Sequence, residues 1–304
     1  MKFLNKMIGS SLPMIPKSIV RSFASHYIAG EDLADAVLVV KNLMEEGARA
    51  TLDILGEEIL EKEKATAVVN EYILVLQTIS SQKLNSTISV KPTHIGLKID
   101  KDFCYDNMVR LLLEAKKLGN FVRIDMEDHT CTTDTIQVYQ RLLKDFDNVG
   151  TVLQAYLRRT INDINELVTI KPNLRICKGI YEEPREIAYK DGFIINRNFA
   201  YALEKLLVGG CFVGIATHDE KLVCEALKII DHHRIPRDQY EFQMLLGVEP
   251  QLKQIILQQG YPLQIYVPFG KEWYAYSLRR LKESPDVTGH VMRGTLRRML
   301  RLEV

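Results

Sequence analysis

The strongest constraint on the fold is an alternation that runs from residue 48 to the end of the chain. A short apolar or β-branched run is followed each time by a longer stretch with helical spacing. The predicted strands are Ala50–Leu55, Thr87–Val90, Phe121–Met126, Thr151–Tyr156, Leu174–Cys177, Cys211–Ala216, Tyr240–Leu245 and Leu263–Val267. The predicted helices between them include Thr66–Ser80, Tyr105–Leu118, Thr133–Phe146, Asn196–Leu207, Leu222–His232 and Glu249–Gln259. Strands that alternate with helices are typical of βαβ units and a parallel sheet.

Eight such units, spaced by roughly 22 to 38 residues, suit a closed (β/α)8 barrel. An open doubly wound sheet is the alternative. Neither a G-x-G-x-x-G nor a G-x-x-x-x-G-K-[ST] motif occurs in the chain, and the first of these is typical of dinucleotide-binding open sheets. We therefore predict an α/β protein with a TIM-like barrel over residues 48–304.

Residues 1–47 are predicted to form a helical extension before the barrel. Glu31–Glu46 has apolar residues at helical spacing, acidic residues at its start and Gly47 at its end. Met1–Phe23 mixes basic residues with short apolar pieces, and Pro13 and Pro16 interrupt it. A signal peptide needs a longer apolar centre, so we do not predict one; an amphipathic segment on the protein or on a membrane stays open.

Composition is that of an ordinary globular protein. The 304 residues are 46% hydrophobic and 26% charged, and 40 basic against 39 acidic side chains give no global field that would attract nucleic acid. The five cysteines show no Cys-x-x-Cys pairing, which favours reduced thiols in a cytoplasm over a disulfide framework or a structural zinc site. No apolar run approaches the roughly 18 residues of a membrane span.

Polar residues gather at the predicted carboxyl ends of the strands, where a barrel carries its chemistry. Each has an ordinary structural explanation. Lys91 precedes Pro92 and suits an exposed turn, and Gln154 suits a core amide. Arg175 and Lys178, three apart on a strand, are expected on opposite faces. Seven or eight polar strand ends at one barrel mouth nevertheless favour a site lined by both signs of charge.

The segment Tyr276–Glu283 adds a receptor for a small anion. On a helix, Tyr276, Arg279, Arg280 and Glu283 fall within one sector of the surface. Two adjacent guanidiniums bind a carboxylate through planar, bidentate contacts. Taken alone the segment also suits a solvated basic helix face, and the polar strand ends favour the receptor.

A divalent metal site is the alternative use of the acidic residues and histidines. Asp125, Glu127, Asp128, His129, His218 and Asp219 carry suitable ligand atoms. No His-Glu-x-x-His motif is present, and Lys91, Arg123, Arg175 and Lys178 would repel a cation. We predict no metal.

Nine short motifs, in order, resemble the flavin-dependent proline dehydrogenases, particularly their short monofunctional bacterial form. They span about residues 48–284 and read Leu-Gly-Glu (55–57), Val-Lys-Pro (90–92), Arg-Ile-Asp-Met-Glu (123–127), Gln-Ala-Tyr-Leu-Arg-Arg (154–159), Lys-Gly-x-Tyr (178–181), Ala-Thr-His-Asp (216–219), Tyr-Glu-Phe-Gln (240–243), Tyr-Val-Pro-Phe-Gly (266–270) and Tyr-x-x-Arg-Arg-Leu-x-Glu (276–283).

The resemblance implies a (β/α)8 barrel that binds FAD without a Rossmann motif, oxidises L-proline to Δ1-pyrroline-5-carboxylate and passes electrons to a membrane quinone. It implies catalytic roles for Arg175, Lys91 and Asp125, and substrate contacts from Lys91, Asp125, Tyr181, Tyr266, Tyr276, Arg279, Arg280 and Glu283. FAD contacts would come from Met126, Gln154, Arg175, Lys178, Thr217 and His218. Glu57 would pair with Arg279 as a gate over the substrate.

Two positions depart from the family pattern. Ile180 stands where a small residue is commoner, and Glu182 stands where the bifunctional relatives have tryptophan. No second, aldehyde-oxidising domain is recognisable, so a separate pyrroline-5-carboxylate dehydrogenase is expected as a partner. His290–Val304 suits a basic amphipathic helix on a bilayer or a helix packed on the barrel. The expected location is the cytoplasm, with attachment to the inner membrane face left open.

Two other functions are alternatives. One is another flavin barrel, such as a methylenetetrahydrofolate reductase-like enzyme, which needs a larger pocket and a nicotinamide site. The other is a non-catalytic barrel that senses a metabolite.

Overall fold

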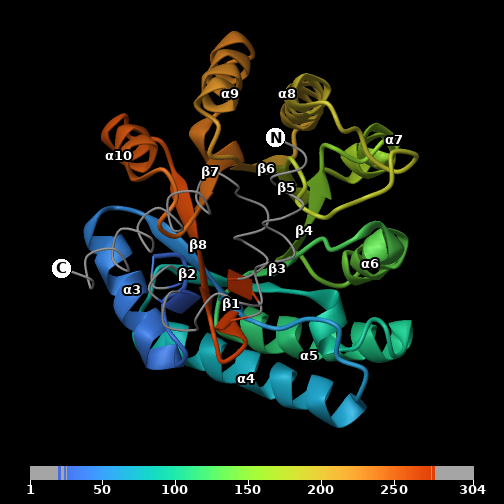
Figure 1. Cartoon of the computed structure of the whole chain (residues 1–304), viewed down its shortest axis with the longest axis vertical. Helices are drawn as coiled ribbons and strands as arrows, with labels where there is room; N and C mark the ends of the chain where they lie inside the picture. Colours follow the sequence, from blue (N-terminus) through green and yellow to red (C-terminus); the bar gives the residue numbers. More distant parts are fainter. Residues whose placement is uncertain (1–19, 22–23, 25, 275, 278–304) are drawn as a thin grey trace, which may run out of the picture.

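Eight parallel strands close into a barrel in chain order in the computed structural model, which describes residues 20–21, 24, 26–274 and 276–277 (Figure 1). Each strand pairs with the next, and β8 returns to β1 with Leu52 opposite Val267. The strands are β1 (Arg49–Ile54), β2 (Ser86–Val90), β3 (Val122–Ile124), β4 (Val149–Gln154), β5 (Asn173–Cys177), β6 (Phe212–Ala216), β7 (Tyr240–Leu245) and β8 (Leu263–Phe269).

Helices surround the barrel on its outer side (Figure 1). They are α3 (Leu33–Glu45), α4 (Lys62–Ser81), α5 (Lys101–Lys117), α6 (His129–Leu142), α7 (Thr160–Leu167), α8 (Gly192–Val208), α9 (Glu220–His232) and α10 (Pro250–Gln258), with short 3-10 turns η2 (Pro92–Ile95), η3 (Val168–Ile170) and η4 (Arg237–Gln239). Four of the helices begin where an aspartate side chain accepts a hydrogen bond from the first-turn backbone, namely Asp100, Asp128, Asp191 and Asp219. The helix α3 packs against β8 and β1.

The apolar core lies between the strands and the helices. Leu52, Ile88, Ile124 and Val213 are fully buried there, and along β1, β7 and β8 such apolar residues alternate with buried polar ones. No helix among the described residues is long and apolar enough to cross a membrane.

The barrel interior is polar instead. Its side chains reach one another across strands that are not neighbours in the sheet, and such contacts can pass only through the lumen. Gln264 of β8 donates to Thr87 of β2 at 3.3 Å, and Arg175 of β5 donates to Ser89 of β2 at 3.3 Å. The hydrogen-bonded lumen therefore continues directly into the barrel mouth.

The predicted fold is confirmed in class and in strand order. All eight predicted strands exist, with ends within a few residues of those expected. The helix α7 was not among the helices named, and α6 begins four residues before the predicted Thr133 because Asp128 caps it. The division at residue 47 stays a prediction.

Candidate active site

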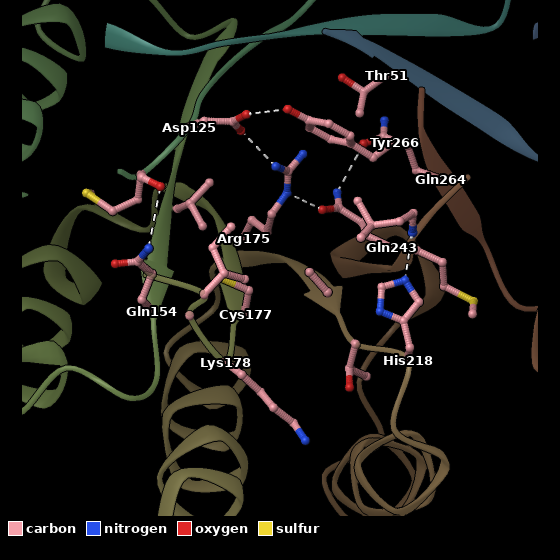
Figure 2. A pocket seen from close by; sticks show the side chains of 18 of the residues that line it. Thr51, Asp125, Gln154, Arg175, Cys177, Lys178, His218, Gln243, Gln264 and Tyr266 are labelled. Atoms are coloured by element: carbon pink, nitrogen blue, oxygen red, sulfur yellow. Dashed lines mark hydrogen bonds and ion pairs between the residues drawn. The ribbon is translucent and has the colours of Figure 1, made fainter. Parts of the chain in front are cut away.

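A cavity of about 810 Å³ lies at the carboxyl ends of the strands (Figure 2). The predicted site residues that line it are Lys91, Asp125, Met126, Gln154, Arg175, Lys178, Tyr181, Thr217, His218, Tyr266 and Tyr276. Glu57 is exposed and is not among the lining residues. Arg279, Arg280 and Glu283 lie outside the described residues. The structure thus brings most of these side chains to one cavity, and the roles assigned to them stay predictions.

The charged end of the cavity is built around Lys91, which follows β2. Its ammonium donates to both carboxylate oxygens of Asp53, at 3.0 and 2.8 Å, and to the Tyr266 hydroxyl at 3.3 Å. Burial alone lowers the pKa of Lys91, but the negative charges of Asp53 and Asp125 outweigh it, and the pKa lies above its usual value. Lys91 is therefore held as a cation.

Asp53 is the buried counter-ion of this lysine. It is 0% exposed, and the Tyr72 hydroxyl on α4 also donates to it, at 3.3 Å. Burial raises the pKa of Asp53, while Lys91 opposes that rise. Asp53 thereby links β1, the strand before the predicted gate residue Glu57, to Lys91 in the cavity.

Asp125 joins the lysine to an arginine. The Tyr266 hydroxyl donates to its Oδ2 at 2.9 Å, and Nη1 of Arg175 donates to its Oδ1 at 2.8 Å (Figure 2). Burial and then Asp125 raise the pKa of Tyr266 well above its usual value, so this phenol stays a donor. Both carboxylate oxygens of Asp125 are thereby engaged.

Arg175 is held on all three of its nitrogens. Besides Asp125, its Nη2 donates to Ser89 Oγ at 3.3 Å and its Nε donates to Gln243 Oε1 at 2.5 Å. Its guanidinium lies 5.6 Å from the Tyr266 ring centroid. Arg175 is 8% exposed, so its plane is fixed and one edge meets the cavity.

Another part of the cavity wall has an acceptor without a partner among the described residues, the Gln154 side-chain oxygen, and a cation, Lys178. Gln154 donates through Nε2 to the Met126 carbonyl at 3.5 Å, and its buried Oε1 has no partner among the described residues. Lys178 donates to Asp219 at 2.8 Å, and His218 Nε2 accepts from the Leu245 backbone at 2.8 Å. A ligand with an N–H donor would satisfy the Gln154 oxygen.

Arg175 and Lys178 line the same cavity, although their spacing predicted opposite faces of one strand. The reason is that β5 ends at Cys177, so strand alternation no longer applies to Lys178. Gly179 follows with φ +103°, and a Cβ there would lie 2.2 Å from the Tyr156 ring. Only glycine lets the chain leave the strand over that tyrosine.

The loop that carries Glu57 is hydrogen-bonded to η2. Thr93 accepts from the Glu58 backbone N–H at 2.9 Å, and it donates from its hydroxyl and its backbone N–H to Glu127, at 2.6 and 2.9 Å. Burial raises the pKa of Glu127 to about 7, and the bonds from Thr93 oppose the rise. Glu127, the second carboxylate after β3, thus supports the loop of the predicted gate.

Gly56 lets the same loop lie close to His94. Its φ is +154°, and a Cβ would lie 2.2 Å from His94 Nε2. Burial, with the nearby Lys91 cation, lowers the pKa of His94 to about 3, so the ring is neutral.

The two positions that depart from the family pattern are both accessible. Ile180 is 43% exposed and lines the cavity beside Tyr181, and Glu182 is exposed. The neighbouring Glu183 is buried and accepts from the His129 backbone at 2.8 Å. Ile180 therefore contributes to the cavity wall, whereas Glu183, the residue after Glu182, is held by the contact with His129.

The side chains that bond directly to Lys91 or Arg175 include three that were not predicted as site residues: Asp53, Ser89 and Gln243. Asp53 and Gln243 lie near the carboxyl ends of β1 and β7, and alternation along these strands points both of them inward. Ser89 gave no signal, because a serine in a strand is unremarkable. Among the described residues no group of three metal-ligating side chains is arranged to hold an ion.

Comparison with known proteins gives one consistent likeness. A proline dehydrogenase family model matches residues 36–179 and 195–293. Proline dehydrogenase 2 of Bacillus subtilis (strain 168) is 36% identical over 295 residues, which cover 96% of this chain and 94% of that protein. Proline dehydrogenase 1 of the same organism is 34% identical over 275 residues, covering 90% and 91%.

Among solved structures, proline utilization A from Bdellovibrio bacteriovorus, inactivated by N-propargylglycine, superposes with a TM-score of 0.82 at 24% identity. The match covers 87% of this chain and 33% of that one, so this chain spans about a third of that protein. At this identity the likeness concerns the fold.

Proposed function

This chain belongs to the proline dehydrogenase family, whose members are oxidoreductases that act on proline, and we propose that it oxidises L-proline to Δ1-pyrroline-5-carboxylate with FAD as the hydride acceptor. The reaction is the first step of proline catabolism.

The observation that carries the proposal is the linked set of charges at the cavity. Substrate proline is a zwitterion and needs fixed positive charge for its carboxylate and an acidic or polar partner for its amine. Lys91 and Asp125 both bond to the Tyr266 hydroxyl and supply the two charges at one cavity. Because each is already held by protein partners, little ordering remains to be done when substrate binds.

The residues present fit a flavin. The Gln154 oxygen, which has no partner among the described residues, would accept from a ring N–H, and Lys178 would supply a cation for a phosphate. When bound, the flavin supplies the hydride-accepting chemistry. Met126, Arg175, Thr217 and His218 complete the proposed contacts, with Arg175 beside the flavin ring.

In this mechanism the chain binds and orients proline and keeps water out of the site. Lys91, together with Arg279 and Arg280, would hold the carboxylate, while Asp125 faces the amine. Tyr181, Tyr266 and Tyr276 would wall in the ring, and Glu283 would complete the site. The guanidinium of Arg175 would stabilise negative charge that develops next to it. Glu57 paired with Arg279 would close the mouth, which keeps reacting atoms together and water out.

Further parts of the proposal concern the surroundings of the reaction. Electrons would pass to a quinone, with contact at the inner face of the membrane, and a separate pyrroline-5-carboxylate dehydrogenase would consume the product. The cytoplasm is the proposed location, and residues 48–304 the proposed catalytic barrel.

Anaerobic addition of L-proline to the purified protein tests the proposal. The protein should be yellow, and its flavin absorbance should bleach with L-proline and stay unchanged with an equal concentration of L-alanine. Bleaching by a reduced nicotinamide, and none by proline, would favour the reductase alternative, and a flavin that proline leaves oxidised would favour a sensor. A colourless protein that takes up no FAD would refute the proposal.

A further inference from the structure

Three neighbouring strands place Arg175, Gly214 and Glu241 side by side. In the sheet register Arg175 of β5 is opposite Gly214 of β6, and Gly214 is opposite Glu241 of β7. The glycine φ is not in the left-handed region, so backbone conformation does not require glycine here. What it supplies is space in the lumen between the arginine and the glutamate.

The amide of Gln243 fills that space. A Cβ on Gly214 would lie 2.6 Å from Gln243 Nε2, 2.7 Å from Cδ and 2.9 Å from Oε1. Gln243 begins on β7, and its amide lies over β6 to reach Arg175 on β5 (Figure 2). A side chain at position 214 would push the amide away from the arginine.

The oxygen and the nitrogen of the Gln243 amide are both hydrogen-bonded. Oε1 accepts from Arg175 Nε, and Nε2 donates to Glu241 Oε1 at 2.8 Å and to Gln264 Oε1 at 3.2 Å. An ionised carboxylate only accepts, so Glu241 admits only the NH2 end of the amide. Glu241 is 4% exposed, and its other oxygen lies 3.3 Å from Arg49.

We propose that Glu241, acting through Gln243, is a positioning residue for Arg175. This inference rests on the proposed function only in the role it gives Arg175. With the amide reversed, Nε2 would face Arg175 Nε, and two donors cannot bond. The guanidinium would then lose one of its three fixed contacts and turn relative to Asp125. Glu241 itself is not one of the residues that line the cavity, and by the proposal it touches neither substrate nor cofactor.

Two single variants and one exchange test the proposal in the flavin-loaded protein. Glu241→Gln keeps the size of the side chain and removes its acceptor-only character, so the Gln243 amide is free to reverse. Gly214→Ala displaces the same amide with no change of charge. The double exchange Glu241→Gln/Gln243→Glu restores the contact with Arg175, because a carboxylate at 243 accepts from Arg175 and from the new amide at 241. Gln264, which accepts from Gln243 in the parent, then reverses its amide to donate to position 243 and to accept from the Thr87 hydroxyl. Asp163→Asn is the matched control, since Asp163 is a buried carboxylate on α7 that pairs with Arg159, the residue before that helix.

We expect kcat with proline to fall by roughly 10- to 100-fold in each single variant, as for loss of a hydrogen bond to a charged group. Flavin content should stay at parent level. The double exchange should recover kcat to within about threefold of the parent, and Asp163→Asn should leave it unchanged. Since a purely structural role would not be rescued by exchanging the two side chains, the recovery separates positioning from folding.

Crystal structures of the parent and of Glu241→Gln give a readout that does not depend on activity. The contact between Arg175 Nη1 and Asp125 Oδ1, 2.8 Å here, should lengthen or become partly occupied in the variant. If the parent does not react with proline, the proposed function fails while this contact still decides the inference. An unchanged Arg175 in Glu241→Gln, or a double exchange no better than the single variant, would overturn it.

Discussion

Removal of the Asp53 charge should strongly destabilise the protein and weaken its hold on proline. Asp53 is 0% exposed, and the side chain of its partner Lys91 is 9% exposed. Asp53→Asn leaves a buried ammonium without its nearest anion, and breaking such a pair costs about 3–5 kcal/mol. The asparagine still offers one acceptor oxygen, and Asp125 remains nearby, so we expect the lower end, about 3 kcal/mol.

A double-mutant cycle measures the pair itself. Lys91→Met alone should cost about as much, because it leaves Asp53 buried with Tyr72 as its remaining donor. The combined Asp53→Asn/Lys91→Met variant should be more stable than the sum of the two losses by at least about 2 kcal/mol, since no buried charge is left unpaired.

The assay is urea unfolding at one flavin concentration for all variants, with the transition followed by circular dichroism. Glu61→Gln is the control: its ion pair with Lys64 is 2.7 Å long, but the two side chains are 61% and 66% exposed. That change should stay within ~0.5 kcal/mol. A loss below ~1 kcal/mol in Asp53→Asn would refute the reasoning, because the pair would then behave like a surface one.

Three further outcomes are expected. Burial raises the pKa of Glu127 from 4.5 to about 7, so the folded state binds the extra proton and its stability falls as pH rises from 4.5 to 7. Glu127→Gln should remove about 2 kcal/mol of the change in unfolding free energy between pH 5 and pH 7, and an equal change in parent and variant would contradict this. Gly179→Ala should lower flavin content and the unfolding temperature, because its Cβ meets the Tyr156 ring at 2.2 Å; an unchanged absorbance ratio of flavin to protein would count against the steric account. Arg280→Lys should raise KM for proline at least tenfold, since an ammonium does not reproduce a bidentate guanidinium contact; unaltered proline kinetics would remove this arginine from the site.

The sequence predicted the barrel well because each strand carries a strong and local signal. Phe121–Met126, for example, is apolar and β-branched at its start and acidic at its end, and β3 lies there. Helix starts were less accurate, since a cap such as Asp128 is a single side chain and resembles the other acidic residues around it.

The candidate site was predicted in its members but not in its connections. Strand ends place Lys91, Asp125 and Arg175 near one another without saying which carboxylate pairs with which cation. Asp53 engages Lys91, and Asp125 engages Arg175 and the Tyr266 hydroxyl, because barrel stagger and side-chain length select those partners. Spacing along one chain carries no information on contacts between strands that are not neighbours.

The hydrogen-bonded lumen also decides where evolution can change this protein. In many enzymes the catalytic residues lower the stability of the fold, and they can be substituted while the scaffold stays folded. Here the ladder from Arg49 through Glu241, Gln243 and Arg175 to Asp125 serves the scaffold and the cavity at once. A single substitution in this ladder therefore disturbs both the stability of the barrel and the shape of the cavity. Substitutions at accessible positions such as Ile180, which lines the cavity but is not part of the ladder, can change substrate preference more readily.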